Sequence, residues 1–221
     1  MLSVTACPRA FPEGEILEIA ALTGVTSTPS GGDTTATFTG KYVFVTPGTH
    51  HGAFNTGFAN PILGADDFCA NQKPASLRGT GTDYKAMIVD GTNRIACTNA
   101  NCAGGGPHSS WIMRADTEYR RADDQTVFTT NSNAVFDFGA ASLTAAFDTD
   151  ATPLHWWTGL DQDWRTTVSG NTCVSWATNV GGFDGTYGSS AATDNNSISD
   201  VANSNFGDGC NTLNRLLCVE Q

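Results

Sequence analysis

Apolar residues along the chain gather in short runs that are separated by glycine, proline and polar stretches. The run Lys41–Thr46 is β-branched and aromatic and ends at Pro47 and Gly48, which predicts a strand. Tyr84–Val89 predicts a second strand. The last residues, Cys210–Gln221, form an apolar strand that two cysteines bracket. A strand near a chain end generally has to be paired or tied to stay ordered, so we expect the rest of the chain to close around it.

Residues 64–77 have helical spacing. The positions i, i+3, i+4 and i+7 of one face are occupied by Ala65, Phe68, Cys69 and Gln72. Asp66 and Asp67 fall in the first turn of this predicted helix, where the helix dipole favours carboxylates. The spacing therefore predicts that Cys69 faces the core.

Aromatic residues are densest after residue 154. The three clusters, which predict the main core, are Leu154–Leu160, Asp161–Trp164 and Asn171–Trp176. The following stretch, Gly181–Gly209, holds few large apolar residues and is rich in Asp and Asn. This pattern predicts a long irregular loop, bracketed by Cys173 and Cys210, that burial alone does not order.

Length and charge narrow the class of protein. The 221 residues are enough for one core with a tail, and we expect a tether over residues 1–40, where proline, glycine and threonine are frequent, and one domain over residues 41–221. The formal charge of −11 repels phosphate backbones, so no nucleic-acid partner is expected. The chain has no apolar run of about 18 residues, so we expect no membrane-spanning helix.

The seven cysteines, the many glycines and the few lysines resemble an exported, disulfide-bonded protein. Cys97 and Cys102 have the wrong spacing for a zinc knuckle, which favours a local disulfide. Bonds from Cys173 to Cys210 and from Cys69 to Cys218 would enclose long loops and fit the sequence. Four cysteines nevertheless allow three connectivities, so these pairs stay open at this point.

Cys7 is the odd cysteine. Its context, Val4-Thr5-Ala6-Cys7, resembles the lipobox at which bacterial lipoproteins are cleaved and acylated. Residues 1–6 lack the basic start and apolar core of a complete signal peptide. The interpretation is therefore either a lipid anchor at Cys7 or a free thiol in a tail.

Catalytic motifs are absent from the sequence, and we expect no enzyme, cofactor or resident metal. Asp161 and Asp163 have a spacing that a calcium site or a glycosidase pair also uses, as any Asp-x-Asp loop does. His50 and His51 are interpreted as a solvated loop pair rather than as zinc ligands.

Several short motifs together resemble the C-type-lectin-like fold, and more closely its endostatin branch. In chain order they are Gly64-Ala-Asp66, Tyr119-Arg-Arg-Ala-Asp123, Trp157-Thr-Gly-Leu160, Cys173-x₂-Trp176, and Cys210 followed by Cys218 within Leu-Leu-Cys-Val-Glu-Gln. Bacterial members with these motifs are the leptospiral endostatin-like surface proteins. The resemblance covers about residues 41–221 and implies an α+β fold of mixed antiparallel sheets, one or two helices and long irregular loops.

The resemblance also implies the nested disulfides Cys69–Cys218 and Cys173–Cys210, and a terminal strand paired with Lys41–Thr46. It further implies an outer-membrane surface lipoprotein, or a secreted protein, that binds host molecules such as complement factor H, plasminogen, laminin or fibronectin. The sugar-binding signatures of lectins, Glu-Pro-Asn, Gln-Pro-Asp and Trp-Asn-Asp, are missing from this sequence.

Three functions are weighed. The first is an adhesin that binds host proteins or glycosaminoglycans, because a basic segment of this acidic chain carries residue types that dominate interfaces. Its candidate residues are Trp111, Arg114, Arg120 and Arg121. The second is a lectin that uses the Gly181–Gly209 loop, with Tyr187 as a stacking platform. The third is a structural surface protein without a dedicated ligand.

Overall fold

The computed structural model describes residues 38–105, 108–150, 154–167, 171–200 and 207–221. Thr39–Gln221 form one compact unit. Most of the expected tether, including the expected lipidation site Cys7, lies outside the described residues. No helix in the described part is long and apolar enough to cross a membrane. The described part is a mixed α+β protein with mostly short strands and few helices.

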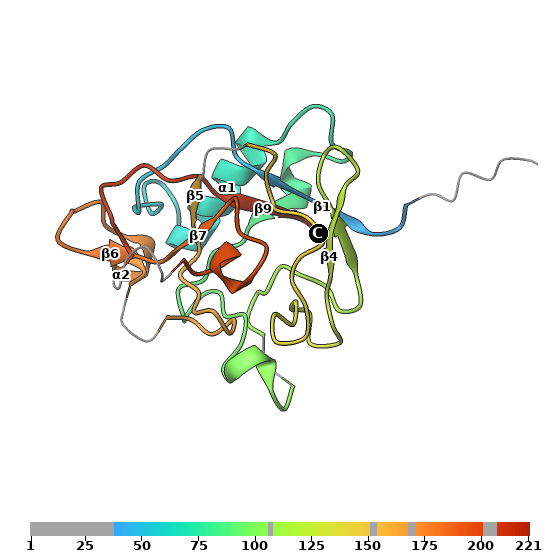
Figure 1. Ribbon diagram of the computed structural model, residues 1–221. Helices are drawn as coiled ribbons and strands as arrows, with labels where there is room; N and C mark the ends of the chain where they lie inside the picture. Colours follow the sequence, from blue (N-terminus) through green and yellow to red (C-terminus); the bar gives the residue numbers. More distant parts are fainter. Residues whose placement is uncertain (1–37, 106–107, 151–153, 168–170, 201–206) are drawn as a thin grey trace, which may run out of the picture. The chain divides into compact units, whose positions relative to one another are not determined.

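A five-stranded sheet forms the centre of this unit, in the order β2-β9-β1-β3-β4 (Figure 1). Its strands, in that order, are Tyr84–Ala86, Leu217–Glu220, Lys41–Val45, Glu118–Arg120 and Thr126–Thr129. β9 pairs antiparallel with both β1 and β2, and β1 pairs parallel with β3. The predicted pairing of the terminal strand with the first strand is confirmed. The second strand is shorter than predicted, because β2 ends at Ala86.

Both faces of the sheet are covered at β9, whose four positions are all buried. Successive side chains of a strand point to opposite faces. Val43 and Val219 belong to one apolar cluster, which also contains Trp156 and Trp164. Phe44 and Cys218 belong to a second cluster. The tryptophans at positions 156, 157, 164 and 176 are at most 1% exposed, so the predicted aromatic core is confirmed.

Helix α1, Pro61–Gln72, packs on the second cluster and begins three residues before the predicted start. Asn60 caps it, because its side chain accepts a hydrogen bond from the Leu63 amide at 3.1 Å. The first turn holds no acidic residue, so the prediction for Asp66 and Asp67 was wrong. Asp66 instead forms an ion pair at 2.8 Å with Arg94, whose side chain is 2% exposed. Cys69 faces the core as predicted, with no exposed surface.

Eight shorter elements complete the described part. They are η1 Gly81–Asp83, η2 Ala100–Cys102, β5 His155–Trp157, α2 Cys173–Trp176, β6 Asp184–Gly185, β7 Tyr187–Ser189, η3 Asn195–Ser197 and β8 Asp208–Gly209. β5 pairs with β7, and β6 pairs with β8. The predicted irregular loop Gly181–Gly209 therefore contains three short strands and a 3₁₀ turn, although residues 201–206 lie outside the described part.

Element α2 is a left-handed turn. All four of its residues, Cys173–Trp176, have φ between 48° and 61°. Residues other than glycine rarely adopt this left-handed backbone conformation, which costs about 1–2 kcal/mol per residue. Two bonds hold the turn: the disulfide of Cys173, and the hydrogen bond of 2.7 Å from the Trp176 indole to the Val89 carbonyl.

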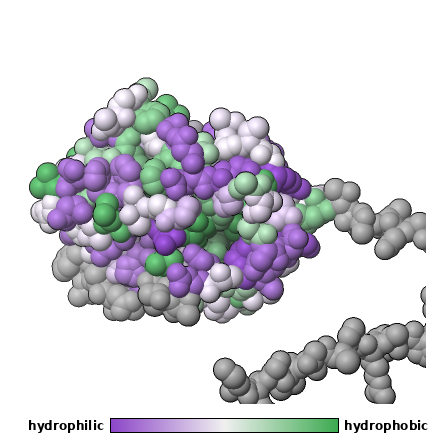
Figure 2. Space-filling model, turned by 90° about the horizontal axis from the view of Figure 1, so that it is seen from above, coloured by the Kyte–Doolittle hydropathy of each residue, from purple (hydrophilic) through white to green (hydrophobic). Residues whose placement is uncertain are grey.

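Three disulfides tie the described part together. They join Cys69 to Cys218, Cys97 to Cys102 and Cys173 to Cys210. The two nested pairs that the resemblance implies and the predicted local pair are confirmed. On the face shown in Figure 2, hydrophilic residues cover much of the surface and the hydrophobic residues form small separate patches.

Candidate functional site

A hollow lined mainly by polar residues has a volume of about 450 Å³. We call it the Asp161–Arg165 pocket. The residues that line it are Asn101, Phe138, Gly139, Asp161, Gln162, Asp163, Arg165 and Asn195. They come from four separate segments of the chain, so the fold is needed to bring them together.

The turn Asp161–Arg165 forms one side of this pocket. The Asp161 amide donates to the Arg165 carbonyl at 2.8 Å, and the Trp164 amide donates to the Asp161 carbonyl at 3.1 Å. Trp164 has a left-handed backbone, with φ of 69°, which is unusual for a bulky residue. Its ring is buried, and its indole donates to the Phe136 carbonyl at 2.7 Å. The buried ring therefore anchors a turn whose other side chains face the pocket.

The Cys97–Cys102 disulfide braces the neighbouring wall. The Cys97 amide donates to the Trp164 carbonyl at 3.2 Å, and the Asn101 amide donates to the Asp163 carbonyl at 2.8 Å. Asn101 has a left-handed backbone with φ of 50°, which asparagine adopts more readily than most residues. The disulfide loop thus places the Asn101 side chain at the edge of the pocket.

An ion pair sets the electrostatics of the pocket. Asp163 Oδ2 lies 2.8 Å from Arg165 Nη2 and 2.9 Å from Arg165 Nε. The hydrogen bond with Asp163 raises the pKa of Arg165. The arginine side chain is 41% exposed, so the pair contributes little to stability. Its main effect is to hold a carboxylate and a guanidinium side by side at the pocket surface.

Two further groups are oriented by neighbours. Gln162 Nε2 donates to Asn196 Oδ1 at 2.9 Å and to the Ser199 carbonyl at 3.2 Å. Phe138 is partly buried and stacks on Trp164, with ring centroids 5.8 Å apart. The pocket therefore combines an amide and a charged pair with one aromatic wall. Such a mixture of a few oriented polar groups with apolar lining is typical of small-molecule sites.

The described residues contain no group of three or more His, Cys, Asp or Glu placed to hold a metal ion. Asp163, one of the two pocket carboxylates, is already paired with Arg165. His50 and His51 line a different hollow of about 250 Å³, beside Phe54 and Phe68.

The residues predicted for adhesion lie outside the Asp161–Arg165 pocket. Trp111 is partly buried, donates to the Ala134 carbonyl at 2.9 Å and packs edge-on against Trp164. Arg114 is exposed. The Trp111 indole is therefore held by contacts with the core, whereas the Arg114 side chain is accessible to a ligand.

Arg120 and Arg121 pair with separate carboxylates. Arg120 Nε lies 2.6 Å from Glu118, and Arg121 Nη2 lies 2.8 Å from Asp123. The hydrogen bond from Arg120 lowers the pKa of Glu118, and the hydrogen bond from Arg121 lowers the pKa of Asp123. The structure does not gather the three predicted arginines into one uncompensated basic patch.

Tyr187, the predicted stacking platform, is 3% exposed and stacks on His155 with centroids 4.2 Å apart. The structure gives this ring no accessible face for a sugar. Phe138 is the aromatic residue that lines the Asp161–Arg165 pocket, and the sequence reasoning missed it together with Asn101, whereas Asn195 lies in the Gly181–Gly209 loop of the lectin hypothesis. The spacing of Asp161 and Asp163 was a usable signal, although it pointed to calcium or glycoside hydrolysis.

Comparison with curated proteins finds no match. Comparison with protein families finds one whose description is "Protein of unknown function (DUF1554)" and which matches residues 49–193. The matched segment includes seven of the eight residues that line the Asp161–Arg165 pocket, all but Asn195. Because the match covers more than half of the 221 residues, the chain belongs to the DUF1554 family.

Proposed function

We propose that the chain is an exported binding module that takes a carbohydrate in the Asp161–Arg165 pocket. The observation that carries this proposal is the convergence of a paired carboxylate and guanidinium with oriented amides around one aromatic wall. Sugar hydroxyls both donate and accept hydrogen bonds, and charged partners strengthen such bonds. The apolar face of a sugar ring fits an aromatic wall such as Phe138.

The C-type-lectin-like, endostatin-type fold is part of the proposal. It is supported by the two nested disulfides and by β9 lying beside β1. The lectin function proposed from the sequence used the Gly181–Gly209 loop, and Asn195 brings that loop to the pocket. The proposed site differs from that hypothesis in its aromatic residue, which is Phe138 instead of Tyr187.

Export is supported by the three disulfides, because such bonds persist in oxidising compartments and are rare in the cytosol. Anchoring at an outer-membrane surface through Cys7 remains a prediction. Mass spectrometry of the native N-terminus is the measurement that checks it.

A glycan array followed by calorimetry with the best-binding sugar tests the carbohydrate proposal. Asn101→Gly removes the amide and keeps the left-handed backbone free of strain, since glycine accepts that conformation. We expect this variant and Gln162→Ala to weaken sugar binding by about three- to tenfold each, the effect of one or two lost hydrogen bonds.

Asp116→Gly is the matched control for Asn101→Gly. Asp116 is also left-handed, with φ of 48°, but it is exposed and does not line the pocket. Sugar affinity should be unchanged in this variant. An array without signal, or equal affinities in all three variants, would refute the proposed site. A chelator added to the array separates direct binding from calcium-dependent binding.

Adhesion to a host protein is the second candidate function, and Arg114 is the observation that favours it. Its side chain is exposed and makes no ion pair with the described residues. Uncompensated arginines at a surface are favourable contact residues for protein partners and sulfated chains.

Binding to immobilised fibronectin and to heparin across a salt series tests this second function. Arg114→Ala should weaken binding by about tenfold at low salt, and Arg120→Ala should have a smaller effect because Glu118 already holds that guanidinium. Equal binding by wild type and Arg114→Ala would exclude the arginine as a contact.

A further inference from the structure

Strand β1 has an open edge in the middle of the molecule. On one side, Val43–Val45 pair with β9. On the other side, β3 pairs with β1 only at Lys41 and Tyr42, and the chain then turns away at residues 121–123. No strand of the described residues covers Val43–Val45 on this second side. The unpaired part of the edge is therefore three residues long.

The register shows which backbone groups face this edge. The Thr46 amide donates to the Leu216 carbonyl at 2.9 Å, and the Leu216 amide donates to the Thr46 hydroxyl at 3.0 Å, so the N–H of Thr46 faces the chain that leads into β9. Alternate residues of a strand direct their backbone groups to the same side, so Phe44 also faces β9. The N–H and C=O of Val45 and the C=O of Val43 then point to the open edge. An unpaired edge of this kind is a template for another strand.

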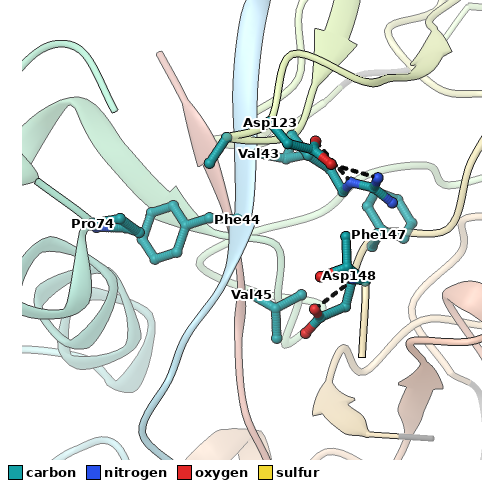
Figure 3. Close-up of a pocket in the computed structure, with 10 residues that line it drawn as sticks. Val43, Phe44, Val45, Pro74, Asp123, Phe147 and Asp148 are labelled. Atoms are coloured by element: carbon teal, nitrogen blue, oxygen red, sulfur yellow. Dashed lines mark hydrogen bonds and ion pairs between the residues drawn. The ribbon is translucent and has the colours of Figure 1, made fainter. Parts of the chain in front are cut away.

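A hollow of about 210 Å³ lies at this edge. Figure 3 shows Phe44 pointing to one side of β1, toward Pro74, while Val45, Phe147 and Asp148 lie on the other side. A strand added in the plane of the sheet would thus meet apolar side chains on both faces. We call this hollow and the edge of Val43–Val45 the β1 slot.

We propose that the β1 slot binds an extended peptide segment of a partner protein, which adds a strand to the sheet beside Val43–Val45. The backbone donors and acceptors at the edge select a main chain as the ligand, because they repeat at the spacing of a strand. The apolar walls select small or β-branched side chains, which alternate between the two faces as they do along any strand.

The charges of the slot specify the flanks of this peptide. Arg121 and Asp123 line the slot, but they pair with each other at 2.8 Å. Asp148 also lines it and makes no ion pair with the described residues; its side chain accepts the amides of Thr149 and Asp150. The slot therefore carries a net negative charge and favours a peptide with a lysine or arginine beside its apolar centre.

A synthetic peptide of about seven residues, with alternating valine and threonine between two lysines, is the probe. Hydrogen exchange of the full chain supplies the readout, with an internal control. In the free protein, the Val45 amide should exchange much faster than the Phe44 amide, which faces β9. A saturating amount of peptide should slow exchange at Val45 by at least about tenfold and leave Phe44 unchanged.

Two altered peptides distinguish backbone pairing from non-specific hydrophobic binding. N-methylation of alternate amides removes main-chain donors and keeps every side chain, so it should weaken binding by at least about tenfold. Replacing the lysines by glutamates should also weaken binding, because Asp148 then repels the flanks.

Two protein variants complete the test. Val45→Pro removes one donor at an edge position, which a strand tolerates best, and should abolish protection of the edge by the peptide. Asp148→Lys should reverse the preference for lysine over glutamate flanks. This variant still tests the proposal if Val45→Pro does not fold. Neither residue lines the Asp161–Arg165 pocket, so the sugar proposal and this one fail independently.

Three results would overturn the proposal. The first is no binding of the lysine-flanked peptide at millimolar concentration. The second is equal binding of the N-methylated peptide. The third is protection of Val45 in the full chain without peptide, because a second copy or another part of the chain would then already fill the slot.

Discussion

At the scale of single residues, burial changes the chemistry of His50. Its ring stacks on Phe54 with centroids 4.4 Å apart, and its Nδ1 donates to the His51 carbonyl at 2.6 Å. Burial lowers the pKa of His50, although the bond to His51 works in the opposite direction. The unfolded chain therefore binds a proton at His50 more readily than the folded chain. By linkage, folded stability from this group is present above the unfolded pKa of about 6.5 and falls as the pH drops.

This linkage gives a first prediction. In wild type, the free energy of unfolding should decrease as the pH falls from about 7.5 to about 5.5, and His50→Phe should reduce that slope because it keeps the stacked ring and removes the titrating group. Urea unfolding at a series of pH values measures both slopes. Equal slopes in the two proteins would show that His50 does not contribute.

Gly52 is a second residue whose role depends on a close approach. A Cβ added to it would lie 2.3 Å from the Cys173 sulfur and 2.8 Å from the Cys173 Cβ. We predict that Gly52→Ala lowers the free energy of unfolding by about 1–3 kcal/mol and leaves some Cys173 and Cys210 thiols unpaired. Urea unfolding and thiol titration check this. Gly182→Ala is the control, because a Cβ there meets no atom within 4 Å, and it should be nearly neutral.

At the scale of elements, local signals identified strands and disulfides better than element ends. The β-branched run at Lys41 predicted β1, and the cysteine spacing predicted the 97–102 bond. The predicted helix began too late because Asn60-Pro61, a cap followed by proline, is the actual start signal. Asp66 resembled a first-turn residue and is instead the partner of Arg94, which is 28 positions away.

The candidate site shows the same limit. Asp161 and Asp163 could be identified as candidate site residues because they are close in sequence. Asn101, Phe138 and Asn195 reach the pocket through tertiary contacts, for which the sequence carries no local spacing. The left-handed turn α2 could not be predicted from the sequence either, because long-range bonds hold its residues in a backbone conformation that they do not prefer locally. The sequence pattern and the resemblance therefore predicted the pairing of β1 with β9, the disulfides and one segment of the site.

Disulfide removal separates the roles of two of these bonds and gives a third prediction. In the loop model, which is one of several accounts, Cys97–Cys102 closes a short loop worth about 2 kcal/mol and Cys69–Cys218 a long one worth about 5 kcal/mol. Replacing the first pair by serine should cost little stability but should weaken sugar binding, because Asn101 loses its brace. Replacing the second pair should mainly lower stability.

Thermal unfolding and calorimetry of the two double variants supply the measurements for this comparison. Sugar affinity that is unchanged without the Cys97–Cys102 bond would show that the loop does not position the pocket.

At the scale of the whole molecule, β9 closes the described fold. It lies between β2 and β1, and its side chains contribute to both apolar clusters. Glu220 adds an ion pair of 2.7 Å with Arg78. Loss of β9 would therefore leave both β1 and β2 without the partner that they share.

The fourth prediction follows from this position. A chain that ends at Leu216 should lack a cooperative unfolding transition, because β1 and β2 lose their shared neighbour and Cys69 loses its partner. Removal of Gln221 alone is the control. It should lower stability only modestly, through the loss of contacts such as the hydrogen bond of 2.7 Å from the Gln221 amide to the Asp83 carbonyl. Near-ultraviolet circular dichroism and limited proteolysis distinguish the two chains.

The position of β9 also affects the timing of folding. About 170 residues separate β1 from β9, so the sheet cannot assemble while the ribosome is still adding the intervening segments. At about 5–20 residues per second, the nascent chain spends roughly ten seconds or more without β9. For an exported chain, as proposed above, this delay has a use: a secretion pore threads unfolded chains, and the sheet could then close where disulfides form.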